Sequence, residues 1–259
     1  MQDINLKAEH PQPELCGAPT EFLDYDHPSI QDWLRIHLDD DSRHLIRDSQ
    51  ITDTDSQPDS DQARKLAVKL YYLVRDGWRY NPYTVYLERE KSRASYVLQQ
   101  KQSYCIPKAL LLATFARAVG IPARLGFGDV KNHLSSQRLI DYLRNDVFAF
   151  HGFAELYLEG QWVRATPAFD ARLCAKFHVE PLEFDGVNDS LFQEYDKNGR
   201  RFMDYIRYHG VFADLPWDYI FDSLREIYPH IFEQGMIDGD LLQEASQAAP
   251  VKGHAADAD

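Results

Sequence analysis

Two stretches in the first half of the chain place apolar residues at helical spacing. The stronger stretch predicts an amphipathic helix at residues 61–78, which Pro82 ends. Its apolar side consists of Leu66, Leu70, Leu73 and Val74. The weaker stretch predicts a short helix at residues 29–38. Residues 39–60, rich in Asp and Ser, are expected to separate the two helices as an acidic loop.

Residues 105–119 differ from both stretches, because apolar residues occur there on almost every side. The polar exceptions are Lys108, Thr114 and Arg117. Pro107 suits the first turn of a helix, and Gly120 followed by Pro122 ends one. A helix that is apolar all round has to lie inside a domain. The pattern therefore predicts a buried central helix.

Strand patterns dominate the second half of the chain. The expected elements are strands at residues 123–130, 147–158, 161–166, 191–195 and 201–208 and a closing helix at residues 217–228. Turns at Glu159-Gly160 and Asn198-Gly199 make two hairpins. Helices followed by hairpins predict an α+β fold, in which the buried helix packs on an antiparallel sheet.

The same patterns divide the chain into three parts. Residues 1–60 are expected to be an extended segment with a short helix and the acidic loop, residues 61–237 one domain, and residues 238–259 an acidic flexible tail. A content of 44% hydrophobic and 13% aromatic residues excludes a wholly disordered chain. The longest apolar run, residues 109–113, is far shorter than the ~18 residues of a membrane span.

Charge and cysteine content narrow the class of partner. A net charge of −13 repels phosphate backbones, so nucleic acid is excluded as a partner and a basic substrate is favoured. The N-terminus lacks the features of a signal peptide. Three cysteines without a Cys-x-x-Cys pair then predict free thiols in a reducing cytoplasm. The histidines at 178, 209 and 230 lack ligand spacing, so neither a metal nor another cofactor is expected.

Cys105 is the first candidate for chemistry, because it begins the buried helix. Unpaired N–H groups and the helix dipole favour a thiolate there, and the same N–H groups suit a developing oxyanion. A buried structural thiol fits the position equally well. An activated thiol paired with a histidine would stay reactive well below the ordinary thiol pKa of ~8.5.

His151 provides a second candidate, on the expected strand 147–158. Even-numbered residues of this strand form its apolar face, so His151 points to the opposite face. A turn at Glu159-Gly160 places Thr166 opposite Phe153 and diagonal to His151, within reach of a hydrogen bond. Thr166 is therefore the third candidate.

The same register pairs Glu155 with Arg164. An ion pair across the two strands is the favoured interpretation of Glu155, ahead of a catalytic role.

Four short segments resemble the transglutaminase-like superfamily. They are Ser-Tyr-Cys-Ile-Pro-Lys-Ala at residues 103–109, Arg-Ala-Val-Gly-Ile-Pro-Ala-Arg at 117–124, His-Gly-Phe-Ala-Glu at 151–155 and Gln-Trp-Val at 161–163. The family has Trp where Phe153 stands and Gly where Ser103 stands. The resemblance spans about residues 61–170. It implies a papain-like fold with a Cys-His-Asp triad, in which Cys105 is the nucleophile and His151 the base.

The third member of that triad is the main departure from the family. Thr166-Pro167 stands where the family has Asp-Pro, so the expected carboxylate is absent. A neutral hydrogen-bonding residue can also orient an imidazole, which favours Thr166. Asp170 is the alternative, if it folds back onto His151. Loss of the charge also fits a weak or inactive site.

Further residues near the nucleophile are candidates for oxyanion or substrate contacts. Tyr104 directly precedes Cys105, and Gln99 or Gln102 could supply an oxyanion donor. A surface polar role is the favoured interpretation of both glutamines. His133, in a loop beyond the strand 123–130, is a candidate substrate contact, with a solvated loop residue as the alternative.

These features predict a cysteine-dependent enzyme that forms an acyl-enzyme on an amide substrate, a peptide or a protein. Hydrolysis is favoured over transfer to an amine. A catalytically impaired binding or scaffold protein is the alternative function, and a redox-sensing thiol is a third. An active pair requires both Cys105 and His151, whereas a sensing thiol does not need His151.

Overall fold

The computed structural model describes residues 10–47, 58–132, 135–191 and 203–247. Its helices are α1 (Pro28–His37), α2 (Asp40–Arg43), α3 (Ser60–Gly77), α4 (Ala94–Val97), α5 (Cys105–Ala118), α6 (Gln137–Leu143), α7 (Ala171–Phe177), α8 (Trp217–Ile227), α9 (Pro229–Gln234) and α10 (Leu241–Gln247). Its strands are β1 (Arg79–Tyr80), β2 (Gln102–Ser103), β3 (Ala123–Asn132), β4 (Val147–Leu158), β5 (Gln161–Ala165) and β6 (Met203–Phe212). Short 3-10 turns cover Pro13–Leu15 and Arg89–Ser92.

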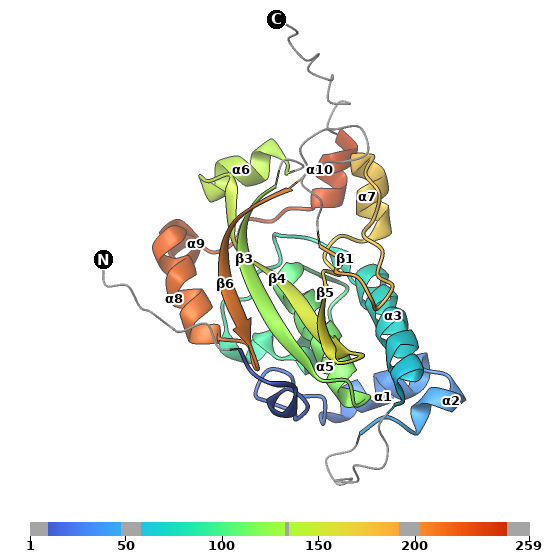
Figure 1. Cartoon of the computed structure of the whole chain (residues 1–259). Coiled ribbons are helices and arrows are strands. Elements are labelled where there is room, and N and C mark those ends of the chain that lie inside the picture. The colour runs from blue at the N-terminus through green and yellow to red at the C-terminus, as the bar shows by residue number, and fades with distance from the viewer. Residues whose placement is uncertain (1–9, 48–57, 133–134, 192–202, 248–259) are drawn as a thin grey trace, which may run out of the picture.

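The main sheet is antiparallel and has the strand order β5-β4-β3-β6. Helix α5 packs on one face of it, chiefly against β4, and α3 packs against α5 (Figure 1). Helices α8 and α9 lie beside β6, at the edge of the sheet opposite to β5 (Figure 1). All 14 residues of α5 are buried, so the predicted central helix and the α+β fold are confirmed.

The predicted hairpin is also confirmed. Strands β4 and β5 pair Leu158 with Gln161 and continue in the same register to Ala154 with Ala165. The turn residue Glu159 has φ 50° and Gly160 has φ 84°. A two-residue turn with both φ angles positive matches the right-handed twist of the strands it joins.

The prediction that side chains alternate strictly between the two faces of β4 is wrong at one point. The β3–β4 register shifts between Gly128 and Val130, and Phe150 has a φ of 57°. One extra residue in β4 reverses the faces of the residues before this bulge, whereas the alternation from His151 onward is kept.

The second expected hairpin is corrected in part. Strand β6 is present, but its partner in the sheet is β3. Nearly all of the proposed first limb lies in residues 192–202, outside the described residues. The expected tail also needs correction, because residues 241–247 form α10, with Leu241 and Ala245 buried. The amphipathic spacing of this helix is too short to stand out in the sequence.

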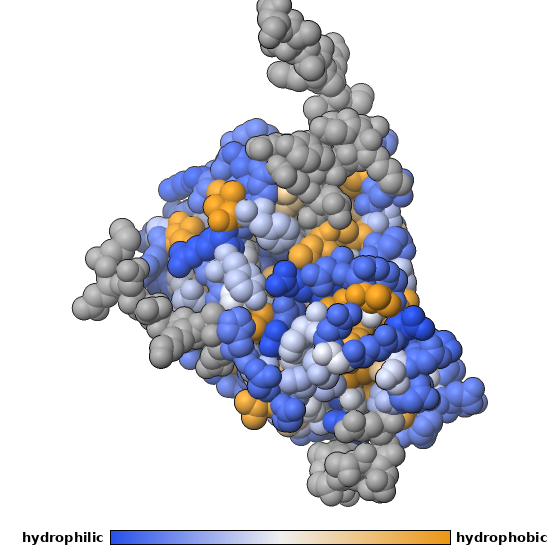
Figure 2. Space-filling model, in the orientation of Figure 1, coloured by the Kyte–Doolittle hydropathy of each residue, from blue (hydrophilic) through white to orange (hydrophobic). Residues whose placement is uncertain are grey.

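The segment before α3 contributes to the main core, in addition to running over the surface. Its buried residues include Cys16, Phe22, Leu23, Leu34, Leu38 and Leu45. Polar residues cover most of the face shown in Figure 2, where apolar residues occur as separate patches. Within the described residues, no helix combines the length and apolar character needed to cross a bilayer.

The three polar residues of α5 find hydrogen-bond partners inside the protein. Lys108 donates to the carbonyl oxygens of Arg75 (2.7 Å) and Trp78 (2.5 Å) and so ties α5 to the end of α3. Burial lowers the pKa of Lys108 to about 7. Thr114 donates to the carbonyl oxygen of its own helix one turn earlier, at 2.7 Å.

Arg117 connects three parts of the chain. Its guanidinium donates to the carbonyl oxygens of Ala18, Ala123 (2.7 and 2.9 Å) and Ala213, and its side chain is fully buried. These bonds join the N-terminal segment, the start of β3 and the chain after β6. A buried charge is stable only when its donors are satisfied.

We predict that Arg117→Lys lowers the free energy of unfolding by about 3 kcal/mol, because a single ammonium group cannot reach three carbonyl oxygens. Chemical denaturation measures the change. Arg225→Lys is the control, since Arg225 pairs with Asp222 on the exposed surface of α8. A loss for Arg117→Lys no larger than that for the control would contradict the role of Arg117.

Candidate active site

Cys105 occupies the first position of α5, where the helix meets β4. A side chain at Gly152 would come within 2.9 Å of the Cα atom of Ile106. Only a glycine therefore permits this approach between the first turn of α5 and the strand. The contact lies just beyond the point where the β4–β5 ladder ends, at Ala154 and Ala165.

The thiol of Cys105 is subject to two opposing effects. Burial raises its pKa to about 11, while the backbone N–H groups of Gly152, Ile106 and Cys105 itself lower it. Burial is the larger effect, so the thiol is protonated at neutral pH. The expected activation by the helix N-terminus is present but does not outweigh desolvation.

His151 lies on β4, next to Gly152, and its side chain is buried. Burial lowers its pKa to about 4, so the ring is neutral at neutral pH. Its ring and that of Tyr205 lie 6.4 Å apart in an edge-to-face arrangement. Within the described residues, the structure shows no hydrogen bond between His151 and Cys105. Both residues nevertheless line the same cavity.

The bulge at Phe150 fixes the backbone immediately before His151. The N–H group of Phe150 donates to Asp129 Oδ1 at 3.0 Å, and His209 Nε2 lies 2.7 Å from the same oxygen. The ring of Phe150 stacks on that of His209, with centroids 4.1 Å apart. Burial raises the pKa of Asp129, but these hydrogen bonds outweigh it and the pKa is lowered.

Asp129 and His209 were not among the candidates from the sequence. They lie about 80 residues apart, at two separate register shifts of the β3–β6 ladder. A histidine in a strand gives no sign of such a partner before the strands are paired.

The cavity that Cys105 and His151 share has a volume of about 100 Å³. Its walls come from the loop 80–87, strands β3, β4 and β6, and helices α6, α8 and α9. Tyr104, directly before Cys105, is also in the wall. An apolar cavity of this size can hold a small apolar group.

Thr166 directly follows β5. Its N–H group donates to the carbonyl oxygen of Ser190, and the N–H group of Ser190 donates to the carbonyl oxygen of Arg164. These two hydrogen bonds keep the backbone extended through Thr166. Alternation then places Thr166 on the sheet face that Arg164, Glu155 and His151 share. The hydroxyl of Thr166 is buried and has no hydrogen-bond partner among the described residues. The residue does not line the cavity.

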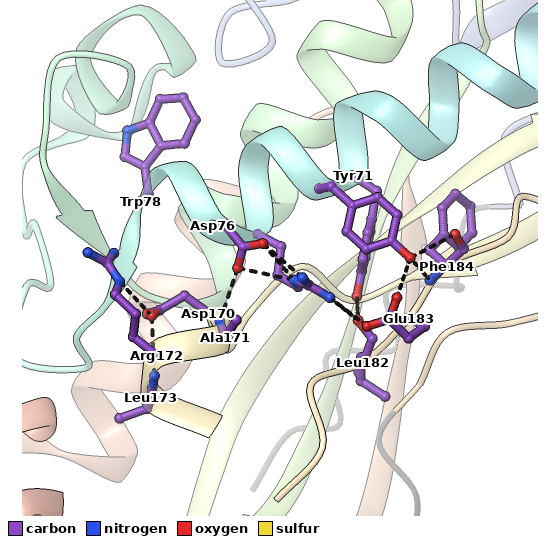
Figure 3. Close-up of polar contacts among 12 residues, drawn as sticks. Tyr71, Asp76, Trp78, Asp170, Ala171, Arg172, Leu173, Leu182, Glu183 and Phe184 are labelled. Atoms are coloured by element: carbon purple, nitrogen blue, oxygen red, sulfur yellow. Dashed lines mark hydrogen bonds and ion pairs between the residues drawn. The ribbon is translucent and has the colours of Figure 1, made fainter. Parts of the chain in front are cut away.

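The carboxylate of Asp170 lies at the start of α7, where dashed lines join it to Arg172 and Leu173 (Figure 3). It accepts hydrogen bonds from the N–H groups of Leu173 (3.3 Å) and Tyr80 (2.8 Å), and Arg172 lies 3.3 Å away. The first of these contacts caps the N-terminus of α7. Asp170 is fully buried and so fixes α7 and β1 relative to each other.

The two candidate glutamines lie in a different, open groove next to α3. Gln99 donates to the carbonyl oxygen of Ser95, and Gln102 accepts hydrogen bonds from Arg79 (2.6 Å) and Asn81 (3.3 Å). The structure therefore does not bring them to the cavity of Cys105. His133 lies outside the described residues.

Glu155 forms the predicted ion pair. Its carboxylate lies 3.0 Å from Arg164 Nε and 2.6 Å from Arg124 Nη2, and its side chain is 3% exposed. A carboxylate held by two guanidinium groups has a structural role. Among the described residues, no group of three His, Cys, Asp or Glu side chains is arranged to hold a metal ion.

A thiol at the start of a buried helix, a histidine on the adjacent strand and a shared cavity define a papain-like α+β protein. Residues 49–167 match the model of the transglutaminase-like superfamily, so this segment of the chain is similar to that superfamily. A comparison with curated proteins gives no significant match.

A comparison with solved structures gives a chain from Cytophaga hutchinsonii described as "a Putative Cysteine Protease". The two chains are 16% identical, with a TM-score of 0.30, and the match covers 69% of this chain. It covers 56% of that chain, so the matched region is little more than half of the relative's length.

We predict that Gly152→Ala lowers the free energy of unfolding by about 1–3 kcal/mol, because the new Cβ atom displaces the first turn of α5. Chemical denaturation measures this change. Gly77→Ala is the matched control, since a Cβ atom there has no neighbour within 4 Å. Equal effects of the two variants would show that the contact with Ile106 is not tight.

Proposed function

We propose that the protein is a thiol enzyme that acts on amide bonds of peptides or proteins through an acyl-enzyme on Cys105. The observation that supports this most directly is the cavity that Cys105 and His151 line together. The match of residues 49–167 to the transglutaminase-like superfamily supports the same chemistry.

The reaction follows from the two side chains. His151 takes the proton of the Cys105 thiol as the sulfur attacks the amide carbonyl carbon. The N–H groups of Ile106 and Gly152 that face the thiol stabilise the negative oxygen that results. The C–N bond then breaks, His151 protonates the departing amine, and a thioester to Cys105 remains.

Water is the proposed acceptor of the acyl group. His151 takes a proton from the water as its oxygen attacks the thioester, and the acid product leaves as the thiol regains its proton. Water needs no binding site of its own, whereas an amine acceptor has to be recognised. We therefore propose hydrolysis rather than cross-linking.

The two pKa values define the expected pH dependence. Between a histidine pKa of about 4 and a thiol pKa of about 11, both groups are neutral, and reaction in which His151 takes the thiol proton does not depend on pH. The fraction of free thiolate rises tenfold for each pH unit up to the thiol pKa, with or without His151, so the route through His151 contributes most at the acid end of this range.

We predict that the rate at which iodoacetamide alkylates Cys105 levels off towards pH 5 in the wild type, because the reaction assisted by His151 does not depend on pH. In His151→Ala the rate is expected to be lower at pH 5 and to rise tenfold per unit. Mass spectrometry of the native protein measures both profiles, with Cys16 and Cys174 as internal controls because both are buried. A tenfold rise per unit in both proteins would exclude His151 as the base.

We also propose that Thr166, rather than Asp170, orients the ring of His151. Its support is the shared sheet face and the buried hydroxyl. Asp170 already accepts hydrogen bonds from Tyr80 and Leu173.

The expected result is that Thr166→Val, which keeps the shape and removes the hydroxyl, lowers the rate of Cys105 acylation about tenfold, and that Thr166→Ser restores it. Asp170→Asn is expected to lower stability, because it weakens the cap of α7, while the pH profile of Cys105 stays as in the wild type. Acylation by p-nitrophenyl acetate and thermal unfolding measure the two effects. A change of the pH profile in Asp170→Asn alone would assign the role to Asp170.

A second candidate function is a binding protein with an impaired site. The absence of a carboxylate at Thr166 and the burial of the thiol favour it. Thr166→Asp distinguishes the two functions, because a carboxylate beside the ring stabilises an imidazolium. Acylation that appears only in this variant would support the binding protein and contradict the enzyme.

A further inference from the structure

The cavity at Cys105 is lined without charged side chains, although the chain as a whole carries a net charge of −13. None of its lining residues carries an Asp, Glu, Lys or Arg side chain. Burial lowers the pKa of His151 and raises the pKa values of Tyr80, Tyr104 and Tyr228, so these side chains are neutral as well.

The cavity lies between two hydrophobic clusters. The main core supplies the side that carries Cys105 and Phe150, and a smaller cluster that includes Leu139, Leu143 and Ile231 supplies the other. Apolar side chains of the two clusters face each other across a cavity of about 100 Å³. This is more than a packing defect, because voids in protein cores are few and rarely exceed the size of a water molecule.

Part of the wall lies outside the superfamily segment. Of the 21 lining residues, seven follow residue 167, and five of these belong to α8, α9 or the residues just after them. The five are Leu224, Tyr228, Ile231, Phe232 and Met236. The size and shape of the cavity therefore depend on the C-terminal part of the chain.

An acyl-enzyme fixes which part of a substrate remains in the cavity. The acyl carbon is bonded to Cys105, so its substituent stays beside the thiol while the leaving group departs. A charged substituent would lose its hydration there without gaining an ion pair, whereas an apolar one would gain from burial.

We propose that the cavity binds an uncharged, apolar acyl group of the substrate, and that α8 and α9 set the length it accepts. This inference rests on the proposed acyl-enzyme. It assigns the specificity of the enzyme to hydrophobic acyl donors and allows the acidic surface to attract a basic region elsewhere in the same substrate.

The test compares p-nitrophenyl esters of four acyl groups. Acetyl and hexanoyl differ by four methylene groups, and adipoyl and 6-aminohexanoyl have the length of hexanoyl with a negative or positive end. We expect kcat/KM for hexanoyl to exceed that for acetyl by about two hundredfold, from ~0.8 kcal/mol per buried methylene. Both charged esters are expected to fall to the acetyl value or below.

Two variants test the position of the bound group. Ile231→Trp fills the cavity and is expected to lower kcat/KM for hexanoyl at least tenfold more than that for acetyl. Ile227→Trp is the matched control, because Ile227 is 42% exposed, lies in α8 and does not line the cavity. Met236→Trp, at a half-buried position of the wall, replaces Ile231→Trp if the latter does not fold.

A binding measurement separates this inference from the proposed function. N-phenyl-1-naphthylamine, an uncharged apolar dye, is expected to fluoresce on binding to the wild type and to Cys105→Ala, and to be displaced by hexanamide. Ile231→Trp should abolish this signal and Ile227→Trp should keep it. Acylation of Cys105 without preference for hexanoyl would overturn the inference and leave the proposed function standing. Dye binding without acylation by any ester would support the apolar cavity and overturn the enzyme.

Discussion

The site depends on the contact between the first turn of α5 and β4 at Gly152. A backbone-to-backbone approach of this kind leaves no room for a side chain, and a Cβ atom at Gly152 would collide with Ile106. The contact brings Cys105 beside the N–H group of Gly152 and next to the strand that carries His151. The other features of the site depend on the hydrogen bonds that stabilise this junction and on the apolar side chains that pack over it.

Two sets of buried hydrogen bonds hold the junction. At the far end of α5, Arg117 joins the N-terminal segment to the start of β3 and to the chain after β6. On the β4 side, Asp129 accepts hydrogen bonds from Phe150 and His209 and so stabilises a φ angle of 57° just before His151. A left-handed conformation at a bulky residue persists only where the surroundings stabilise it.

The apolar side chains that line the cavity over this junction determine the electrostatics of Cys105 and His151. Apolar walls remove water from Cys105 and His151, which raises the pKa of the thiol and lowers that of the imidazole. Both groups are then neutral in the resting protein, so the N–H groups around the thiol stabilise negative charge chiefly as it forms during a reaction. An apolar cavity is consistent with this arrangement, because it favours uncharged groups over water and ions.

The sequence by itself determined the central elements. A run that is apolar on all sides predicted the buried helix from Cys105, and two positive-φ turn positions at Glu159-Gly160 fixed the register that pairs Glu155 with Arg164. Local patterns of this kind depend only on near neighbours in the chain. The tertiary structure decided the rest: the bulge at Phe150, the partner of β6 and the cavity beyond residue 167. These features arise where distant segments meet, and short helices such as α6 and α9 carry too few residues for their buried faces to be recognised before the fold brings them together.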